Sequence, residues 1–357
     1  MTIRVLVVDD SRFICTRIAN ILEHDKELRV VGTAGNGREA ISKTADLDPD
    51  VVTMDVEMPV MDGIAAVAEI MRQTPVPILM FSASTHIGAQ ATLDALEAGA
   101  VDFLPKQLDE IDGDRDTAKH LLRRRVRGVA MQAAKLKVRK LGKGLRHGRP
   151  EKLPQTLQVV HESHARPPIE QFRLLTIVAS TGGPVAMQKI LTQIPEHCSM
   201  PVLLVQHMPG KFTRSFAARL DQLCAIKVKE AEHGDPLLPG QALLAPGGMQ
   251  MEIRGASRKH IILREKTAAE LYSPCADITL TSIARHFPGQ TLAVILTGMG
   301  ADGAQGALQL KRGGSRIWAQ DEQSCTIYGM PKAVVDAQLA DRIYSLEKIS
   351  CEFKKLN

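Results

Sequence analysis

The stretch Val51-Val-Thr-Met-Asp-Val-Glu-Met-Pro-Val-Met-Asp-Gly63 determines how the first third of the chain should fold. It opens with an apolar run of strand length that ends in an aspartate, and a helical pattern begins after Gly63. Four other apolar runs of strand length, each followed by a helical pattern, lie before and after it at residues 3–8, 29–33, 78–82 and 102–104. Five consecutive βα units predict an open, doubly wound parallel sheet with right-handed crossovers.

The last part of the chain shows a second set of apolar runs that alternate with helical patterns. Helices are expected at residues 185–193 and 213–224. Strands are expected at residues 174–179, 202–206, 241–245, 260–263, 292–297 and 315–319. This order predicts a second α/β domain, doubly wound around a mainly parallel but more mixed sheet.

The segment between these two patterns is polar, interrupted by Gly and Pro, and strongly basic. Residues 117–150 hold 12 Lys and Arg and no Asp or Glu, although the net charge of the whole chain is only +5. Such a run is typical of a solvated tether or of a nucleic-acid surface, and the interruptions favour the tether. We expect a first domain over 1–106, a basic, mobile linker over 107–168, a second domain over 169–357, and no nucleic-acid partner.

Composition narrows the class of protein further. The sequence contains no apolar run of about 18 residues, so direct membrane insertion is not expected. The six cysteines are widely spaced and include no Cys-x-x-Cys pair, which argues against a zinc site and against a disulfide framework. We expect a cytoplasmic protein.

Acidic residues follow two strands of the first predicted sheet. Asp9 and Asp10 come directly after the first strand and Asp55 ends the third, so their carboxylates should meet at one edge. Three carboxylates at such short distances repel one another, and a hard cation such as Mg²⁺ between them offsets this repulsion. Ser82 ends the fourth strand and Lys106 follows the fifth, which suits an aspartyl phosphate with Asp55 as nucleophile. An acidic pair after a strand also serves as a helix cap, so Asp9 and Asp10 alone leave both interpretations open.

Residues 2–106 resemble the receiver domain of two-component response regulators, a flavodoxin-like fold. The motifs that carry the resemblance are Val7-Val-Asp-Asp-Ser11, Met54-Asp-Val-Glu-Met-Pro-Val-Met-Asp-Gly63, Phe81-Ser-Ala83 and the region of Lys106. The resemblance implies that Asp55 is phosphorylated, and that the ligands of Mg²⁺ are Asp9, Asp10, Asp55 and the backbone carbonyl of Glu57. It also implies switch roles for Ser82, Phe103 and Lys106. One departure is that Pro105 precedes Lys106, whereas receivers place a proline after the lysine.

Three candidate catalytic residues lie at strand ends of the second predicted sheet. Ser180 follows a strand and opens a Gly-rich turn, a pattern typical of a nucleophile, a phosphate cradle or a plain helix cap. His207 ends the next strand, and Asp302 lies in a Gly-rich turn after another. The carboxyl ends of strands in an open α/β sheet lie along one crevice, so these three side chains should lie together. They predict a Ser-His-Asp hydrolase in which Asp302 orients His207 and His207 deprotonates Ser180. The backbone amide of Met299 is the candidate for binding the oxyanion.

This half of the chain resembles the CheB family of chemotaxis protein-glutamate methylesterases, from about Leu174 to Ala340. The motifs are Ala179-Ser-Thr-Gly-Gly183, Gln206-His-Met208, Phe212–Leu220, Ala245-Pro-Gly-Gly248, Thr297-Gly-Met-Gly-Ala-Asp-Gly303, Ala319-Gln-Asp-Glu322 and Tyr328-Gly-Met-Pro331. A receiver in front of them matches the family's layout. The departures are Gln250, where the family usually has His, and Ser273-Pro-Cys275, and neither is expected to touch Ser180, His207 or Asp302.

The resemblance implies a carboxylic ester hydrolase that removes γ-methyl esters from glutamates of methyl-accepting chemotaxis receptors and deamidates receptor glutamines. It implies a CheA-type histidine kinase as phosphodonor for Asp55, and no cofactor for the ester chemistry. Because a receiver regulates by changing access, we expect the face around Phe103 to dock over Ser180 and His207 until Asp55 is phosphorylated.

Two other classes of function compete with the esterase. A response regulator with a DNA-binding output needs a helix-turn-helix of about 20 residues, and no such pattern follows residue 170. A non-catalytic scaffold would keep the fold without needing Ser180, His207 and Asp302 together. The presence of all three favours the esterase.

Overall fold

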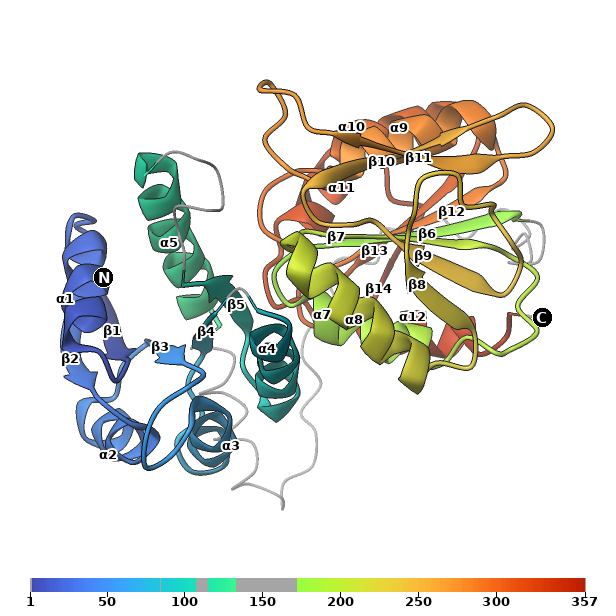
Figure 1. Cartoon of the computed structure of the whole chain (residues 1–357). Coiled ribbons are helices and arrows are strands. Elements are labelled where there is room, and N and C mark those ends of the chain that lie inside the picture. The colour runs from blue at the N-terminus through green and yellow to red at the C-terminus, as the bar shows by residue number, and fades with distance from the viewer. Residues whose placement is uncertain (1, 84, 107–114, 133–171, 357) are drawn as a thin grey trace, which may run out of the picture.

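Two α/β domains make up the structure, a computed structural model that describes residues 2–83, 85–106, 115–132 and 172–356 (Figure 1). The first domain is built on five parallel strands in the order β2-β1-β3-β4-β5. The strands are β1 (Ile3–Val8), β2 (Leu28–Ala34), β3 (Val51–Asp55), β4 (Ile78–Ser82) and β5 (Asp102–Pro105). The predicted doubly wound sheet is confirmed.

The helices of the first domain begin at polar caps that follow the strands. They are α1 (Arg12–Glu23), α2 (Gly37–Leu47), α3 (Gly63–Gln73), α4 (His86–Ala98) and α5 (Arg115–Ala130). Ser11, Asn36 and Asp62 each accept a backbone N–H in the first turn of α1, α2 and α3. Gly63 is required for packing, because a β-carbon there would collide with the carbonyl oxygen of Asp55.

Helix α5 corrects the expected boundary of the first domain. Its apolar positions Ala118, Leu122, Val126 and Val129 are buried in a cluster with strands β1, β3, β4 and β5. They recur at helical spacing between the arginines, so the helix is amphipathic and belongs to the first domain, not to a solvated linker. The remainder of the expected linker, at 107–114 and 133–168, lies outside the described residues.

The second domain is built on a seven-stranded sheet in the order β14-β13-β12-β6-β7-β9-β8. The strands are β6 (Leu174–Ala179), β7 (Val202–Gln206), β8 (Lys227–Glu230), β9 (Gln241–Leu244), β12 (Thr291–Ile295), β13 (Arg316–Gln320) and β14 (Arg342–Tyr344). Every pair of neighbours is parallel, so the expectation of a more mixed sheet is wrong. The antiparallel strands, β10 (Met249–Arg254) and β11 (His260–Glu265), form a separate hairpin.

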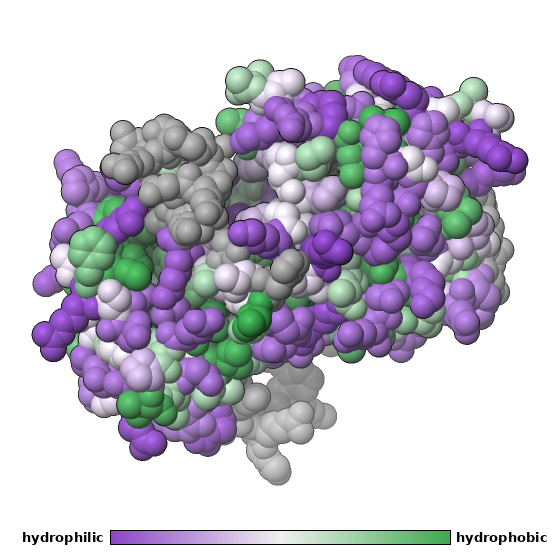
Figure 2. Space-filling view, viewed as in Figure 1, coloured by the Kyte–Doolittle hydropathy of each residue, from purple (hydrophilic) through white to green (hydrophobic). Residues whose placement is uncertain are grey.

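Helices cover both faces of the larger sheet (Figure 1). One face carries α7 (Gly183–Leu191), α8 (Gly210–Leu223) and α12 (Leu346–Phe353). The other carries α9 (Ala276–His286), α10 (Ala304–Arg312) and α11 (Met330–Asp336), together with the hairpin. The surface that Figure 2 shows is mostly hydrophilic, as expected when the apolar faces are turned inward. Within the described ranges, none of these helices is long and apolar enough to cross a membrane.

The two domains pack against each other through α4, α7 and α8, and their buried apolar side chains form one continuous cluster. The rings of Phe103 on β5 and Phe212 on α8 lie 4.5 Å apart between centroids. Arg219 on α8 makes ion pairs of 2.5 Å with both Asp94 and Glu97 on α4. The contact therefore combines an aromatic centre with a charged rim, as expected of an interface between domains.

Candidate functional sites

The acidic residues of the first domain meet at the carboxyl edge of its sheet, as predicted. The carboxylate oxygens of Asp9, Asp10 and Asp55 lie within 4.8 Å of one another. Lys106 places its Nζ 2.5 Å from Oδ2 of Asp55 and 3.3 Å from Oδ2 of Asp9. A proline before the lysine, at Pro105, is thus compatible with the position that a receiver requires.

Burial is the largest of several influences on the pKa of Asp55. It raises the pKa of Asp55 to about 6, an effect that the hydrogen bond from Lys106 only partly opposes and that Asp9 adds to. Oδ2 of Asp9 is buried, and the described group that faces it is the Lys106 ammonium. Three carboxylates whose oxygens lie this close together fit a hard divalent cation such as Mg²⁺.

Two of the three switch candidates, Ser82 and Phe103, contact other groups than Asp55. The Ser82 hydroxyl is fully buried and donates to the carbonyl of Gly88 on α4 at 2.9 Å. Phe103 is 6% exposed and packs on Phe212 of the second domain. Glu57 is joined to Asp55 only through its backbone N–H, 3.4 Å from Oδ1. Both switch side chains therefore contact elements at the domain interface, α4 and α8.

In the second domain, Ser180 and His207 follow paired positions of neighbouring strands. Ala179 on β6 is in register with Gln206 on β7, so the next residues of both strands leave the same edge of the sheet. The Ser180 N–H donates to the carbonyl of Thr297 at 3.0 Å, which holds the third loop beside it. The turn after Ser180 has a left-handed residue, with φ of 75° at Gly182.

His207 and Asp302 are directly joined. Nε2 of His207 lies 2.7 Å from Oδ2 of Asp302, and both side chains are almost fully buried. The backbone N–H groups of Ala276 and Asp277, at the start of α9, also donate to the carboxylate, at 2.7 and 3.0 Å. Burial alone would raise the pKa of Asp302, but the hydrogen bonds from His207, Asp277 and Ala276 lower it to about 2. Asp302 is thus a permanently charged partner for the imidazole.

Ser180 and Met299 complete the predicted set. Ser180 is 3% exposed, and no hydrogen bond joins its side chain to His207 within the described residues. Because Nε2 faces Asp302, Nδ1 is the ring nitrogen left for Ser180. A β-carbon at Gly298 would lie 2.9 Å from that of Ser180, so the loop leading into Met299 passes against the serine. The structure therefore brings together all four residues predicted for this site.

Comparisons with known proteins identify the family of each domain. The family model for the CheB methylesterase matches residues 175–353, and the model for the response regulator receiver domain matches residues 5–113. The chain belongs to the CheB methylesterase family.

Relatives match the chain along nearly its whole length. A protein-glutamate methylesterase/protein-glutamine glutaminase of Pseudomonas putida is 49% identical, with 98% of each chain covered. A protein of the same name from Pseudomonas aeruginosa is 48% identical, again over 98% of each. The crystal structure of the Thermotoga maritima CheB methylesterase catalytic domain is 35% identical with a TM-score of 0.50, and the match covers 52% of this chain and 99% of that one.

The two departures from the usual CheB pattern lie beside the triad candidates. Sγ of Cys275 is 3.1 Å from Oδ1 of Asp302, so the expectation that neither departure touches those residues is wrong. Burial and the nearby charge of Asp302 raise the pKa of this thiol to about 12, which keeps it protonated as a donor. Gln250 is fully buried and holds the same segment by accepting the N–H of Cys275 at 2.8 Å. The family pattern marks both positions as departures, but their contacts are visible only in the folded chain.

The first domain covers the loops that carry Ser180 and Met299. Thr181, the residue after Ser180, donates its hydroxyl to Asp102 on β5 at 2.8 Å, and Arg125 on α5 contacts both side chains. A β-carbon at Gly128 on α5 would collide with Cε of Met299, so that helix touches the loop of the oxyanion candidate. In this CheB family member, therefore, β5 and α5 of the receiver lie directly over the edge that carries the candidate nucleophile.

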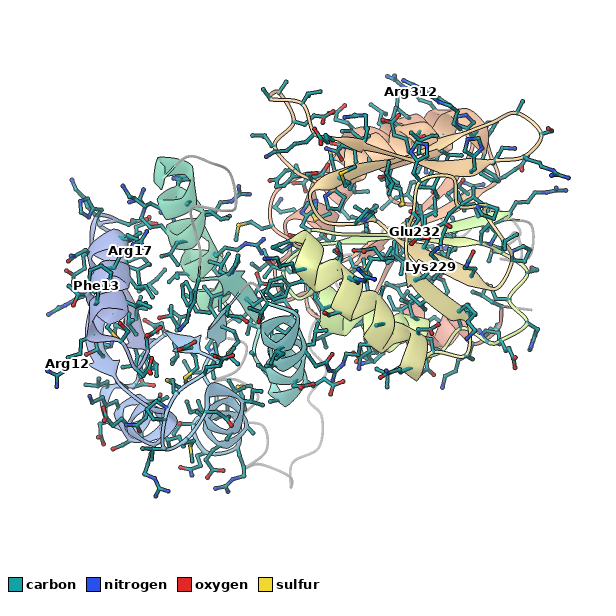
Figure 3. All side chains as sticks on the ribbon, in the orientation of Figure 1. Arg12, Phe13, Arg17, Lys229, Glu232 and Arg312 are labelled. Atoms are coloured by element: carbon teal, nitrogen blue, oxygen red, sulfur yellow. The ribbon has the colours of Figure 1, made fainter. Side chains whose placement is uncertain are left out.

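A separate groove lies between α1 and α5 of the receiver. Its volume is about 660 Å³, and it is lined by Phe13, Thr16, Arg17, Asn20, Ile21, His24, Lys119 and Arg123. Phe13 and Arg17 project from α1, on the side of the receiver away from the second domain (Figure 3). This groove therefore stays accessible while the domains are packed together.

Proposed function

We propose that the chain is a serine hydrolase that removes γ-methyl esters from glutamates of methyl-accepting chemotaxis receptors, and that it also deamidates receptor glutamines. The observation that carries the proposal is the 2.7 Å contact between His207 and Asp302 at the strand edge that also presents Ser180. The names of the Pseudomonas relatives, protein-glutamate methylesterase/protein-glutamine glutaminase, support the choice of substrate.

The chemistry follows from the roles of the three side chains. His207 removes the proton from the Ser180 hydroxyl as Oγ attacks the ester carbonyl carbon, and the tetrahedral oxyanion forms. The proton then passes from His207 to the leaving oxygen, so that methanol departs and an acyl-serine remains. His207 then takes a proton from a water molecule, whose oxygen attacks the acyl-serine carbonyl. His207 returns this proton to Oγ of Ser180 as the glutamate carboxylate is released. With a glutamine side chain, ammonia leaves in place of methanol.

The oxyanion needs a fixed donor close to Ser180. The N–H of Met299 makes no hydrogen bond with any described residue, while the neighbouring Gly298 N–H is already used by the carbonyl of Ile327 at 3.0 Å. A backbone N–H without a partner beside the nucleophile is suited to bind the developing negative charge. This supports Met299 as the oxyanion donor.

The first domain supplies the regulatory input. Asp55 would accept a phosphoryl group from a CheA-type histidine kinase, with Mg²⁺ held by Asp9, Asp10, Asp55 and the carbonyl of Glu57. The cation would neutralise phosphoryl oxygens next to the carboxylates, and Lys106 would add a second positive charge. Ser82 would turn from Gly88 toward the phosphoryl group, and Phe103 would leave Phe212. Both movements would loosen the contact that covers Ser180.

Replacement of Ser180 tests the proposed reaction. Ser180→Ala should reduce methanol release from methylated receptors to the background, because the neighbouring hydroxyls of Thr181 and Thr297 are held by hydrogen bonds to Asp102 and to the Thr181 carbonyl. Phosphorylation of Asp55 by acetyl phosphate and Mg²⁺ should be unchanged. Ser215→Ala on α8 is the matched control and should behave as the wild type. A Ser180→Ala protein that keeps more than about a tenth of the activity would place the nucleophile elsewhere.

A further inference from the structure

The ring of Tyr272 lies flat against the imidazole of His207. The two ring centroids are 4.6 Å apart and the planes differ by only 4°. Asp302 holds the edge of the same imidazole, through Nε2. A ring held at one edge can still tilt about that hydrogen bond, and a flat neighbour on its face removes the tilt. The two contacts together restrict His207 to one orientation.

Gln250 on β10 holds the backbone that carries this tyrosine. Its Nε2 donates to the carbonyl of Tyr272 at 2.7 Å, while its Oε1 accepts the N–H of Cys275. One buried amide thus joins both ends of the segment 272–275. The N–H of Gly248 donates to the carbonyl of Ser273 at 3.1 Å and fixes the middle. The segment is therefore held by three backbone contacts that do not involve the tyrosine ring.

The same segment also leads to the donors that hold Asp302. Its last residue, Cys275, contacts the carboxylate through Sγ, and the first amides of α9 follow directly. One short segment, 272–275, thus positions a neighbour on the face of His207 and the carboxylate at its edge. A shift of this segment would move both at once.

The ring face of Tyr272, and not its hydroxyl, makes the relevant contact. Leu271, the preceding residue, is 83% exposed, whereas Tyr272 is turned inward and half-buried. The Tyr272 hydroxyl forms no hydrogen bond with any residue that the structure describes. A phenylalanine at this position would therefore keep the contact.

We propose that Tyr272 is a positioning residue for His207, held in place by Gln250. This inference rests on the proposed esterase function, in which His207 carries a proton and a positive charge during each half of the reaction. The stacked tyrosine ring keeps the imidazole aimed at Ser180. The effect is expected on the chemical step and not on substrate binding.

The test compares full-length variants in methanol release from methylated receptors. Tyr272→Leu, which keeps an apolar side chain but removes the flat face, should lower kcat about tenfold and leave KM within about twofold. Tyr272→Phe should restore wild-type kcat, and Leu271→Ala is the matched control. An unchanged kcat in Tyr272→Leu overturns the proposal. A rise in KM alone also overturns it, because Tyr272 would then be a substrate contact. A Tyr272→Phe protein with a kcat as low as that of Tyr272→Leu overturns it as well.

A second measurement does not depend on turnover. In protein with isotope-labelled histidine, the His207 ring proton at Nε2 should exchange slowly with solvent in the wild type and in Tyr272→Phe, and faster in Tyr272→Leu. Unchanged unfolding midpoints would show that each variant is folded. A wild type that releases no methanol defeats the proposed function, whereas equal exchange rates in all three proteins defeat the positioning role.

Discussion

Asp55 and Asp302, one buried carboxylate from each domain, have pKa values that are shifted in opposite directions. Burial raises the pKa of Asp55 to about 6, although Lys106 is hydrogen bonded to it. Burial acts on Asp302 in the same direction, yet His207 and the first amides of α9 bring its pKa down to about 2. Asp55 shares its pocket with two other carboxylates, whereas Asp302 faces the start of a helix and an imidazole.

The difference shows that burial alone does not decide the charge of a carboxylate; the donors around it do. Since the pKa of Asp55 is raised, its contribution to stability is present below pH 4 and is lost as the pH rises through about 6. Since the pKa of Asp302 is lowered, its contribution is present above about pH 4 and is lost as the pH falls through about 2. Asp55 is thus suited to accept a cation or a phosphoryl group, and Asp302 to remain charged.

Removal of the charge of Asp302 should have the largest effect. Asp302→Asn should lower the kcat of methanol release by about a thousandfold, because the amide holds the imidazole in the wrong tautomer and does not stabilise its positive charge. Asp336→Asn, an exposed change on α11, is the control. Steady-state kinetics of both proteins at neutral pH make the comparison. A loss of less than about tenfold would show that His207 does not need a permanent charge.

Removal of the charge of Asp55 should stabilise the receiver. Asp55→Asn should raise its free energy of unfolding by about 1–2 kcal/mol at pH 7.5, because the raised pKa means that the ionised carboxylate is costly there. The gain should be about half as large at pH 5, where the wild-type carboxyl is mostly protonated. Unfolding of both proteins at the two pH values measures this, with the exposed Asp46→Asn on α2 as control. A destabilised Asp55→Asn would mean that Lys106 outweighs burial.

Weakening the contact between the domains should have the smallest effect. Arg219→Ala removes both ion pairs to α4, so methanol release by the unphosphorylated protein should rise about two- to fivefold. Acetyl phosphate with Mg²⁺ should then stimulate Arg219→Ala less than the wild type, and should not stimulate Asp55→Asn. A basal rate that stays at the wild-type value would indicate that the aromatic contact of Phe103 with Phe212, and not the charged rim, holds the domains together.

Strand-end residues were predictable from the sequence because parallel sheets bring their carboxyl ends together. That rule alone placed Asp9, Asp10 and Asp55 in one pocket and Ser180 beside His207. The opposite pKa shifts were not predictable in this way. They depend on Lys106 in one pocket and on the amides of α9 in the other, and α9 begins 26 residues before Asp302 in the chain.

Other elements were missed because their partners are distant in sequence. The arginines of α5 suggest a solvated tether until Arg125 is seen with Asp102, and Arg127 with Asp25. Strand β14 has three residues and β8 has a single buried one, so neither shows a hydrophobic run. Strand β10 alternates apolar and polar residues, a signal that was present and overlooked. No sequence motif identifies Tyr272, because its contact with His207 forms only in the folded chain.

The position of α5 over Met299 has a consequence for chemical labelling. A serine-reactive probe added to the protein competes with a helix of the same chain, whose effective concentration near Ser180 stays high however dilute the sample is. Diluting the protein would therefore not expose the site, whereas opening the domain contact would. The labelling rate of Ser180 would then report the fraction of open molecules, and such a probe would be a sensor of the phosphorylation state of Asp55.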